Sequence, residues 1–94
     1  MTYKNEFKSC LDSLFESLCD VSDWMYENPE LGFQEFKTSK YLVDYIQNNS
    51  KPVNFPSHGL ETAFDVTFGE EGPLTVICVE YDALPEIGHA CGHN

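Results

Sequence analysis

Apolar residues recur at alternating steps of four and three along the first part of the chain. The residues with this spacing are Phe7, Leu11, Leu14, Leu18, Val21 and Met25. Because an α-helix has about 3.6 residues per turn, side chains at these positions share one face. The pattern predicts an amphipathic helix from Asn5 to about Tyr26, with its apolar stripe facing a core. Asn28 and Pro29 end this helix, since the residue before a proline is pushed out of the helical region.

A second helical pattern follows a short turn at residues 30–33, in which Gly32 is free to adopt a positive φ angle. From Gln34 to about Asn48, aromatic and aliphatic side chains gather on one side and charged side chains lie elsewhere. This spacing predicts a second amphipathic helix. Both helices are expected to be packing elements that carry no chemistry themselves.

Two segments in the second half of the chain have the patterns of β-strands. Residues 62–68 alternate between larger and smaller or polar side chains, which predicts a strand with one buried face. Residues 74–79 are almost continuously apolar, as in a central strand covered on both faces, and Cys78 is expected there as a buried small hydrophobe. The glycines and proline of residues 69–73 predict a turn, which makes the strands antiparallel neighbours. The predicted fold class is therefore α/β.

Two histidines and a cysteine, His89, Cys91 and His93, occur within five positions near the end of the sequence. Imidazole nitrogens and thiolate sulfurs bind zinc, manganese and related ions. A structural zinc site needs four protein ligands, and a catalytic site needs at least three. The sequence has no second close cluster of this kind, so the site is expected to share its ligands with further sequence.

Two carboxylates, Glu80 and Asp82, stand where the predicted strand 74–79 ends. Loops beyond the carboxyl ends of strands in open α/β sheets commonly hold ligands. A carboxylate beside a metal-binding imidazole accepts its second N–H and fixes the orientation of the ring. Asp82 is the candidate for this catalytic positioning role. Glu80 is either a ligand or electrostatic background.

The charge of the chain excludes some classes of partner. The 94 residues include 16 Asp and Glu but only five Lys and Arg, which gives a net charge of −11. Nucleic-acid binding is not expected, because phosphate contacts need clustered positive charge, and an anionic membrane surface would repel the chain. No apolar run approaches the roughly 18 residues of a membrane span, and no secretory signal is apparent. These features predict a cytoplasmic protein with reduced thiols.

Two motifs together resemble a known family. The segment Tyr81-Asp82-Ala83-Leu84-Pro85, followed by Gly88-His89-Ala90-Cys91-Gly92-His93-Asn94, resembles the metal-site signature of the M20 metallopeptidases, specifically the amidohydrolase branch M20D. Upstream, residues 28–39 are similar to the Asn-Pro-Glu-Leu motif of that branch and the helix after it. The resemblance spans nearly the whole chain. Members of this branch include aminobenzoyl-glutamate hydrolases and certain dipeptidases.

The resemblance implies roles for individual residues. It makes Cys91 and His93 ligands of a centre of two divalent ions, zinc or manganese, and places Asp82 beside that centre. His89 matches a family position that is usually not a ligand. Asn94 and Glu80 both stand where many members have Asp, and both variants are similar to the dipeptidase and aminobenzoyl-glutamate hydrolase subgroup.

The resemblance also implies an activity and a domain organisation. The activity is hydrolysis of an amide bond, in a small peptide or N-acyl amino acid, by metal-activated water. Residues 1–94 then form the N-terminal part of one M20-type catalytic domain, with a mixed sheet between helices. The general base, the other ligands and a lid or dimerisation domain lie downstream in the family, so the chain alone is expected to be inactive. The longer protein is expected to be active, and a homodimer is one form expected of it.

Three other hypotheses remain open from the residues alone. His89, Cys91 and His93 with one more ligand would form a small structural zinc module, although one-residue spacings strain a tetrahedral cage. Cys91 as the nucleophile of a thiol hydrolase is less favoured, because neighbouring sequence positions seldom supply the geometry. A non-catalytic interaction fragment is the third hypothesis. His58, between small loop residues, is expected to be exposed and not a ligand.

Overall fold

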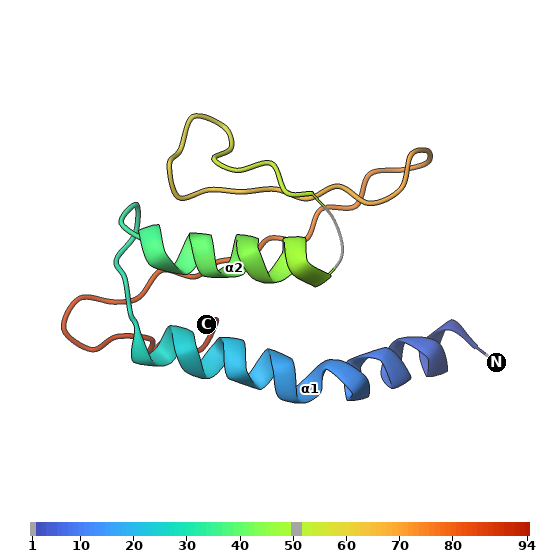
Figure 1. The fold of residues 1–94 in the computed structure, drawn as a ribbon, viewed down its shortest axis with the longest axis horizontal. Coiled ribbons are helices and arrows are strands. Elements are labelled where there is room, and N and C mark those ends of the chain that lie inside the picture. The colour runs from blue at the N-terminus through green and yellow to red at the C-terminus, as the bar shows by residue number, and fades with distance from the viewer. Residues whose placement is uncertain (1, 50–51) are drawn as a thin grey trace.

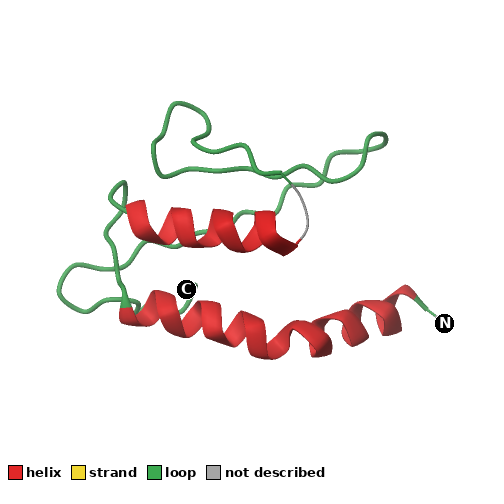
Figure 2. Cartoon of the chain, viewed as in Figure 1, coloured by secondary structure: helices red, strands yellow, loops and turns green. Residues whose placement is uncertain are grey.

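The computed structural model describes residues 2–49 and 52–94 and contains two helices, α1 (Tyr3–Glu27) and α2 (Phe36–Asn49). The helices run antiparallel, and the rest of the chain passes along α2 and returns beside α1 (Figure 1). Figure 2 shows that everything outside the helices is loop in the described part of the chain. Both predicted helices are confirmed, with small shifts at their ends.

Specific polar groups and Pro29 set the ends of α1. The Thr2 hydroxyl accepts a hydrogen bond from the Asn5 amide at 3.3 Å, as expected of an N-cap. At the other end the Asn28 side chain donates to the Trp24 carbonyl at 2.8 Å, and its backbone N–H donates to the Met25 carbonyl at 3.2 Å. These bonds satisfy carbonyls that the end of a helix leaves unpaired. Pro29 then prevents further helical growth.

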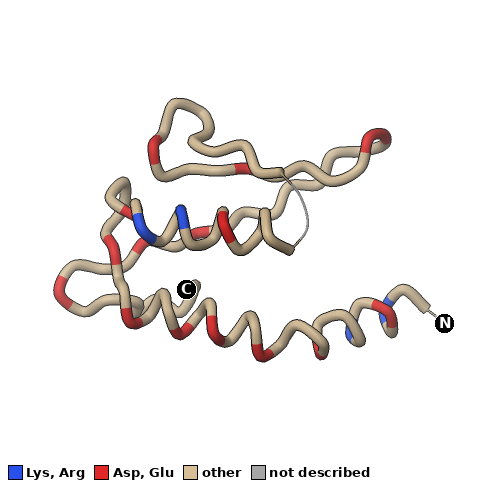
Figure 3. Tube along the Cα trace, in the orientation of Figure 1, with Lys and Arg blue, Asp and Glu red and all other residues tan. Residues whose placement is uncertain are grey.

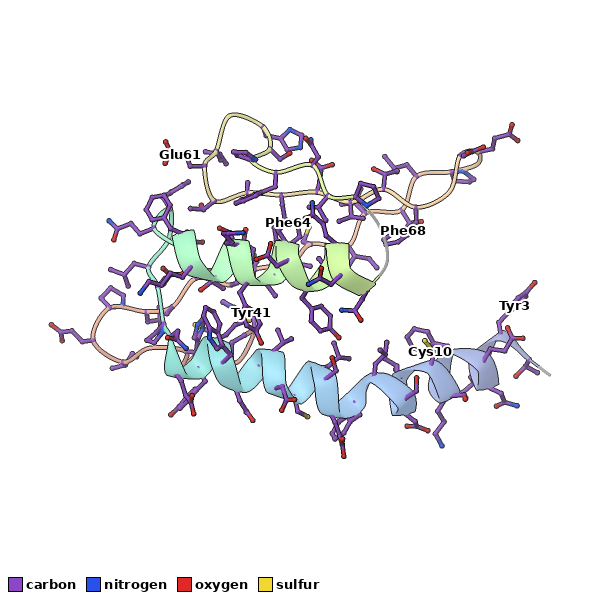
Figure 4. The ribbon with its side chains drawn as sticks, in the orientation of Figure 1. Tyr3, Cys10, Tyr41, Glu61, Phe64 and Phe68 are labelled. Atoms are coloured by element: carbon purple, nitrogen blue, oxygen red, sulfur yellow. The ribbon has the colours of Figure 1, made fainter. Side chains whose placement is uncertain are left out.

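A small hydrophobic core joins the C-terminal part of α1 to α2 and the later loops. Its buried members are Val21, Met25 and Tyr81, and the side chains packed against them are Trp24, Tyr41, Leu42, Tyr45 and Phe64. The rings of Trp24 and Tyr41 stack with centroids 4.2 Å apart. Figure 4 shows Tyr41 pointing from α2 toward α1. The contact between the two helices is therefore largely aromatic.

The predicted apolar stripe of α1 is buried only near its C-terminal end. Met25 is 3% exposed, whereas Phe7 is 67% exposed and Leu11 is 42% exposed. The N-terminal half of α1 extends past α2 (Figure 1), so nothing in the described chain covers it. Acidic residues lie along the outer side of α1 in Figure 3. The helix has the predicted two faces, but only part of the apolar face has a partner.

Neither predicted β-strand forms among the described residues. Residues 62–68 and 74–79 are extended or irregular, and the described chain has only isolated bridges, one of them between Asn54 and Asp65. A strand needs a neighbouring strand for its backbone N–H and C=O groups. The prediction of two antiparallel neighbours in a mixed sheet is therefore not met in this structure.

The segment 74–79 is also far more exposed than predicted. Leu74 is 83% exposed, Ile77 is 85% exposed, and Cys78 is exposed where a buried side chain was expected. The radius of gyration is 14.8 Å, compared with about 12 Å expected for a compact domain of this length. Nothing in the described chain covers either face of this segment, which explains why the expected burial is absent.

The loop between α2 and residue 65 is closed by a polar cluster around Asp65. Its carboxylate accepts hydrogen bonds from the Ser57 hydroxyl and, at 3.1 Å, from the Asn54 side chain. The Ser57 bond, followed by the Asn54 bond, holds the pKa of Asp65 below its ordinary value. His58 lies 3.5 Å from the same carboxylate, and its side chain is 80% exposed. The prediction of an exposed loop histidine is confirmed.

No helix in the described ranges is long and apolar enough to cross a membrane. All four cysteines are free thiols.

Candidate functional site

Asp82 is held between two buried neighbours in the chain. Tyr81 is 8% exposed and Ala83 is 5% exposed, whereas the Asp82 side chain is 46% exposed. The Ala83 amide donates to the Glu30 carbonyl at 2.7 Å. A short segment with both flanks fixed therefore presents the Asp82 carboxylate toward solvent.

A buried polar network fixes Tyr81. The Tyr81 hydroxyl donates a hydrogen bond to the Thr62 carbonyl, and the Thr62 hydroxyl donates to the Glu35 carboxylate at 3.4 Å. Glu35 and Thr62 are both buried. Burial raises the pKa of the Tyr81 phenol, and the negative charge of Glu35 raises it further. The network joins the start of α2 to the residue before Asp82.

We expect Tyr81 to titrate with a pKa above its ordinary value of 10.0. The folded chain holds the phenol proton more tightly than the unfolded chain, so protonation of Tyr81 favours the folded state. The contribution of Tyr81 to the free energy of unfolding is therefore complete below pH ~10 and falls as the pH rises through the raised pKa. The difference between tyrosinate absorbance titrations of the wild type and Tyr81→Phe measures this pKa. A midpoint at or below the ordinary value would contradict the expected burial.

The turn that follows α1 receives the loop that carries Asp82. Leu31 forms a parallel bridge with Ala83, next to the hydrogen bond from Ala83 to Glu30. Pro29 lies against Gly88, where an added Cβ would be 3.8 Å from the Pro29 Cβ. The Asn-Pro-Glu-Leu segment is therefore a docking point for residues 83–88.

The Glu30 carboxylate also caps α2. One oxygen accepts from the Thr38 amide and the Thr38 hydroxyl, both at 2.6 Å, and the other accepts from the Lys37 amide at 3.1 Å. These amides belong to the first turn of α2, where a helix has unpaired N–H groups and a positive dipole end. Thr38 is 0% exposed, so water does not reach its hydroxyl. Glu30 thus caps the N-terminal end of α2 with its carboxylate and holds the loop that carries Asp82 with its backbone carbonyl.

The loop after Asp82 turns back on itself. Leu84 and Gly88 exchange two backbone hydrogen bonds, at 2.9 and 3.1 Å. Gly88 has φ +69° and Gly92 has φ +84°, conformations that a side chain would strain. In the turn at residues 30–33, where Gly32 was expected to be free to adopt a positive φ angle, Phe33 has that conformation instead. The glycines on either side of Cys91 allow the sharp path that brings residue 93 back toward Asp82.

The structure brings Asp82 and His93 together. The His93 Nε2 atom lies 3.8 Å from the Asp82 Oδ1 atom, and the His93 side chain is 32% exposed. Cys91 is an exposed free thiol. His89 is 7% exposed, and its Nε2 atom has no hydrogen-bond partner within the described residues. The buried position of His89 contrasts with the accessible positions of the two predicted ligands.

The donor types suit a divalent metal ion, but their arrangement is incomplete. Thiolate, imidazole and carboxylate are the usual ligands of zinc. In residues 2–49 and 52–94, however, no group of three His, Cys, Asp or Glu side chains is arranged to hold a metal ion. The assignments of Cys91 and His93 as ligands and of Asp82 as their positioning carboxylate therefore stay predictions.

The last residue, Asn94, is attached to α1. Its side-chain amide donates to the Ser22 carbonyl at 3.0 Å and approaches the Ser22 hydroxyl at 3.3 Å. Figure 1 shows the C-terminal end of the chain beside α1. The predicted metal-binding loop is thus fixed at Ala83 and at Asn94.

The sequence alone did not indicate the contacts of Glu30, Glu35 or Asn94. A capping box places its acidic residue at the third position of the helix, whereas Glu30 precedes α2 and reaches it across a turn. The contacts of Asn94 and Glu35 join residues far apart in the sequence. Only the match of residues 28–31 to a family motif marked that turn as important.

The chain is similar to several curated hydrolases along most of its length. It is 27% identical to the amidohydrolase YhaA of Bacillus subtilis over 99% of this chain, and 33% identical to the human Xaa-Arg dipeptidase over 90% of it. It is 28% identical to one of the subunits of the p-aminobenzoyl-glutamate hydrolase of Escherichia coli over 80% of the chain. The chain spans 27, 22 and 19% of the lengths of these relatives, respectively.

No family model matches the chain, and no solved structure matches it. The similarity to curated proteins nevertheless includes relatives named as an amidohydrolase, dipeptidases and deacetylases. The match with the amidohydrolase YhaA, which covers 99% of the chain, includes the Asn-Pro-Glu-Leu turn and the loop from Asp82 to His93, the two segments that dock on each other here. Similarity to peptidases and amidohydrolases along most of the chain thus supports the resemblance of its motifs to the M20 family.

Proposed function

We propose that the longer protein represented by this chain hydrolyses an amide bond in an N-acyl amino acid or dipeptide-like substrate. The observation that carries the proposal is the contact of 3.8 Å between His93 and Asp82. A carboxylate beside an imidazole is the arrangement that orients a metal-binding histidine. The names of the relatives support the reaction class, since dipeptidases, deacetylases and aminobenzoyl-glutamate hydrolases all cleave amide bonds.

In this proposal Cys91 and His93 are ligands of a two-metal centre of zinc or manganese. Bound divalent ions supply a water of lowered pKa and polarise the scissile carbonyl. Asp82 accepts a hydrogen bond from the His93 ring and fixes its orientation. The backbone bond from Ala83 to Glu30 keeps Asp82 in place while its carboxylate stays accessible. A glutamate from another part of the longer protein acts as the general base.

We also propose that residues 74–79 become a strand of a mixed sheet in the longer protein. The exposure of Leu74, Val76, Ile77 and Val79, from 62 to 85%, supports this assignment, because such β-branched and aliphatic residues are normally covered in a sheet. Strand neighbours would come from sequence beyond this chain, within one catalytic domain. The Asp82 loop would then leave the carboxyl end of a buried strand, where ligands commonly bind.

Asn94 and Glu80 guide the proposed substrate class. Both residues fit the dipeptidase and aminobenzoyl-glutamate hydrolase subgroup of the M20D branch. Relatives of both names are similar to this chain. We therefore place dipeptides and aminobenzoyl-glutamate ahead of other amides as substrates to test. A cytoplasmic location and a homodimer remain predictions.

The test is an amidase assay of the longer protein with dipeptides, N-acetyl amino acids and p-aminobenzoyl-glutamate. Treatment with a chelator is expected to lower kcat/KM by about a hundredfold or more, because the activated water and the polarised carbonyl are lost together. Readdition of zinc or manganese restores activity, and readdition of calcium, which prefers oxygen ligands, does not. Full activity of the metal-free protein would contradict the proposal.

A further inference from the structure

We propose that Asn94 is a positioning residue that holds His93 against Asp82, and that this role requires asparagine rather than aspartate. The inference rests on the proposed function and adds a contact between the site loop and α1. Its basis is the pair of hydrogen-bond contacts from the Asn94 amide to the carbonyl and hydroxyl of Ser22.

The chemistry of the Ser22 carbonyl determines which group faces it. A carbonyl oxygen only accepts hydrogen bonds, so the Asn94 atom at 3.0 Å must be the NH₂ group. A helical carbonyl keeps a second lone pair after accepting its bond within the helix. A carboxylate at position 94 has no proton to donate at neutral pH and would place a negative charge against the carbonyl oxygen. Asparagine and aspartate are therefore not equivalent here, although they have nearly the same shape.

The position of Asn94 in the loop explains why this contact affects His93. The loop is fixed at one end by the bond from Ala83 to Glu30 and bends sharply at Gly92, with φ +84°. His93 is the residue between that bend and Asn94, and its own side chain is only partly covered. Within residues 2–49 and 52–94, the polar side chain that the His93 ring contacts is that of Asp82. The anchor on Ser22 therefore limits how far the backbone of His93 can move away from Asp82.

The anchor also uses a rigid part of the molecule. Ser22 lies in α1 between Val21 and Met25, the two buried residues of that helix. The same end of α1 leads directly into the turn at Pro29 and Glu30 that holds Ala83. The two ends of the loop are thus fixed to α1 and to the turn that directly follows it, so the separation of Asp82 and His93 depends on the C-terminal end of α1.

The experiment compares Asn94→Asp and Asn94→Ala with the wild-type 94-residue chain by nuclear magnetic resonance. In the wild type, we expect contacts between the Asn94 side-chain amide protons and Ser22, and between the His93 ring and the Asp82 β-protons. Both variants should lose the contact of His93 with Asp82. Zinc titration of the longer protein, which supplies the remaining ligands in the proposed function, should show binding about tenfold to a hundredfold weaker in both variants, as for other residues that orient metal ligands.

A matched control and a fold measurement keep the test decisive. Ser22→Ala keeps the carbonyl that accepts the shorter bond, so this variant should retain the contact of His93 with Asp82. Helical circular dichroism and Trp24 fluorescence should be unchanged in all variants, because Asn94 is outside the hydrophobic core. Persistence of the contact of His93 with Asp82 in both Asn94 variants would overturn the proposal.

The proposed function can fail separately from this inference. If Cys91→Ser with His93→Ala binds zinc as tightly as the wild type, the ligand assignment is wrong. The loss of the contact between the His93 ring and the Asp82 β-protons in Asn94→Asp is still measurable in that case. Conversely, zinc binding that depends on Cys91 and His93 but is indifferent to residue 94 contradicts the positioning role alone.

Discussion

Replacement of Cys91 by serine together with His93 by alanine is expected to abolish amide hydrolysis by the longer protein. The two substitutions remove a thiolate and an imidazole from the proposed metal centre at once. Loss of a residue that merely orients a ligand costs about tenfold to a hundredfold, so loss of two ligands should exceed that range. The measurement is kcat/KM for the best amide substrate, with the metal content of each purified variant.

The control for this prediction uses the same residue types at other exposed positions. Cys10 is an exposed free thiol on α1, and His58 lies in the loop closed by Asp65. Cys10→Ser with His58→Ala is expected to keep the metal content and kcat/KM of the wild type. Unimpaired hydrolysis by the Cys91 and His93 double variant would rule out the ligand assignment. The separate effects of Cys91→Ser and His93→Ala on kcat/KM should not sum to the effect of the double variant, because ligands of one centre act as a unit.

Replacement of Glu30 by alanine is expected to lower the free energy of unfolding by about 2–3 kcal/mol. The substitution removes the acceptor of three hydrogen bonds at the start of α2. It also leaves the fully buried Thr38 hydroxyl without a partner. A lost helix cap costs about 0.5–2 kcal/mol, and an unsatisfied buried polar group costs about 1–3 kcal/mol. Urea unfolding followed by circular dichroism measures the change.

Two variants identify the cause of this loss. Glu30→Gln keeps an acceptor oxygen for the two Thr38 bonds and should be less destabilising than Glu30→Ala. Asp44→Ala removes another carboxylate of this region, one that pairs with Lys40 at 3.1 Å on the exposed surface of α2. It should change the free energy of unfolding by less than about 1 kcal/mol, as is usual for surface pairs. Equal effects of the Glu30 and Asp44 variants would contradict the capping role.

The two helices could be predicted because their signals are local. The stripe from Phe7 to Met25 has helical spacing, and Asn28 with Pro29 supplies its own end signal. The amount of burial could not be predicted from that stripe. Phe7 has the same periodicity as Met25, yet only Met25 meets Tyr81 in the core. Burial depends on which segments return to the helix, and periodicity does not encode their path.

The two predicted strands are absent from the described part of the chain for a related reason. Residues 74–79 have the composition of a buried strand, but strand formation depends on a partner and not on the segment alone. The structure provides no neighbouring strand within the described ranges. The side chain of Cys78 is exposed because no neighbouring strand lies beside this segment in the described ranges.

The candidate site could be predicted in part. The spacing of carboxylate, thiol and imidazole groups indicated a metal site at residues 80–93, and the family resemblance assigned roles to Asp82, Cys91 and His93. The structure brings Asp82 and His93 within 3.8 Å. The sequence could not indicate what holds them there. Glu30 holds Ala83 and Asn94 holds Ser22 through contacts between residues far apart in the sequence, and hydrophobic periodicity does not indicate such contacts. The ligand roles themselves are tested by the metal measurements proposed above.

The exposed segment from Leu74 to Val79 also affects the colloidal behaviour of the chain. Six consecutive residues with high β-propensity, no charge and no proline form a sequence prone to cross-β association when they are exposed. Glu70 and Glu71 precede this segment and Glu80 follows it, in the manner of charged gatekeeper residues. The net charge of −11 adds repulsion between copies. High salt screens that repulsion, so solutions of the isolated chain are best kept dilute and at low ionic strength.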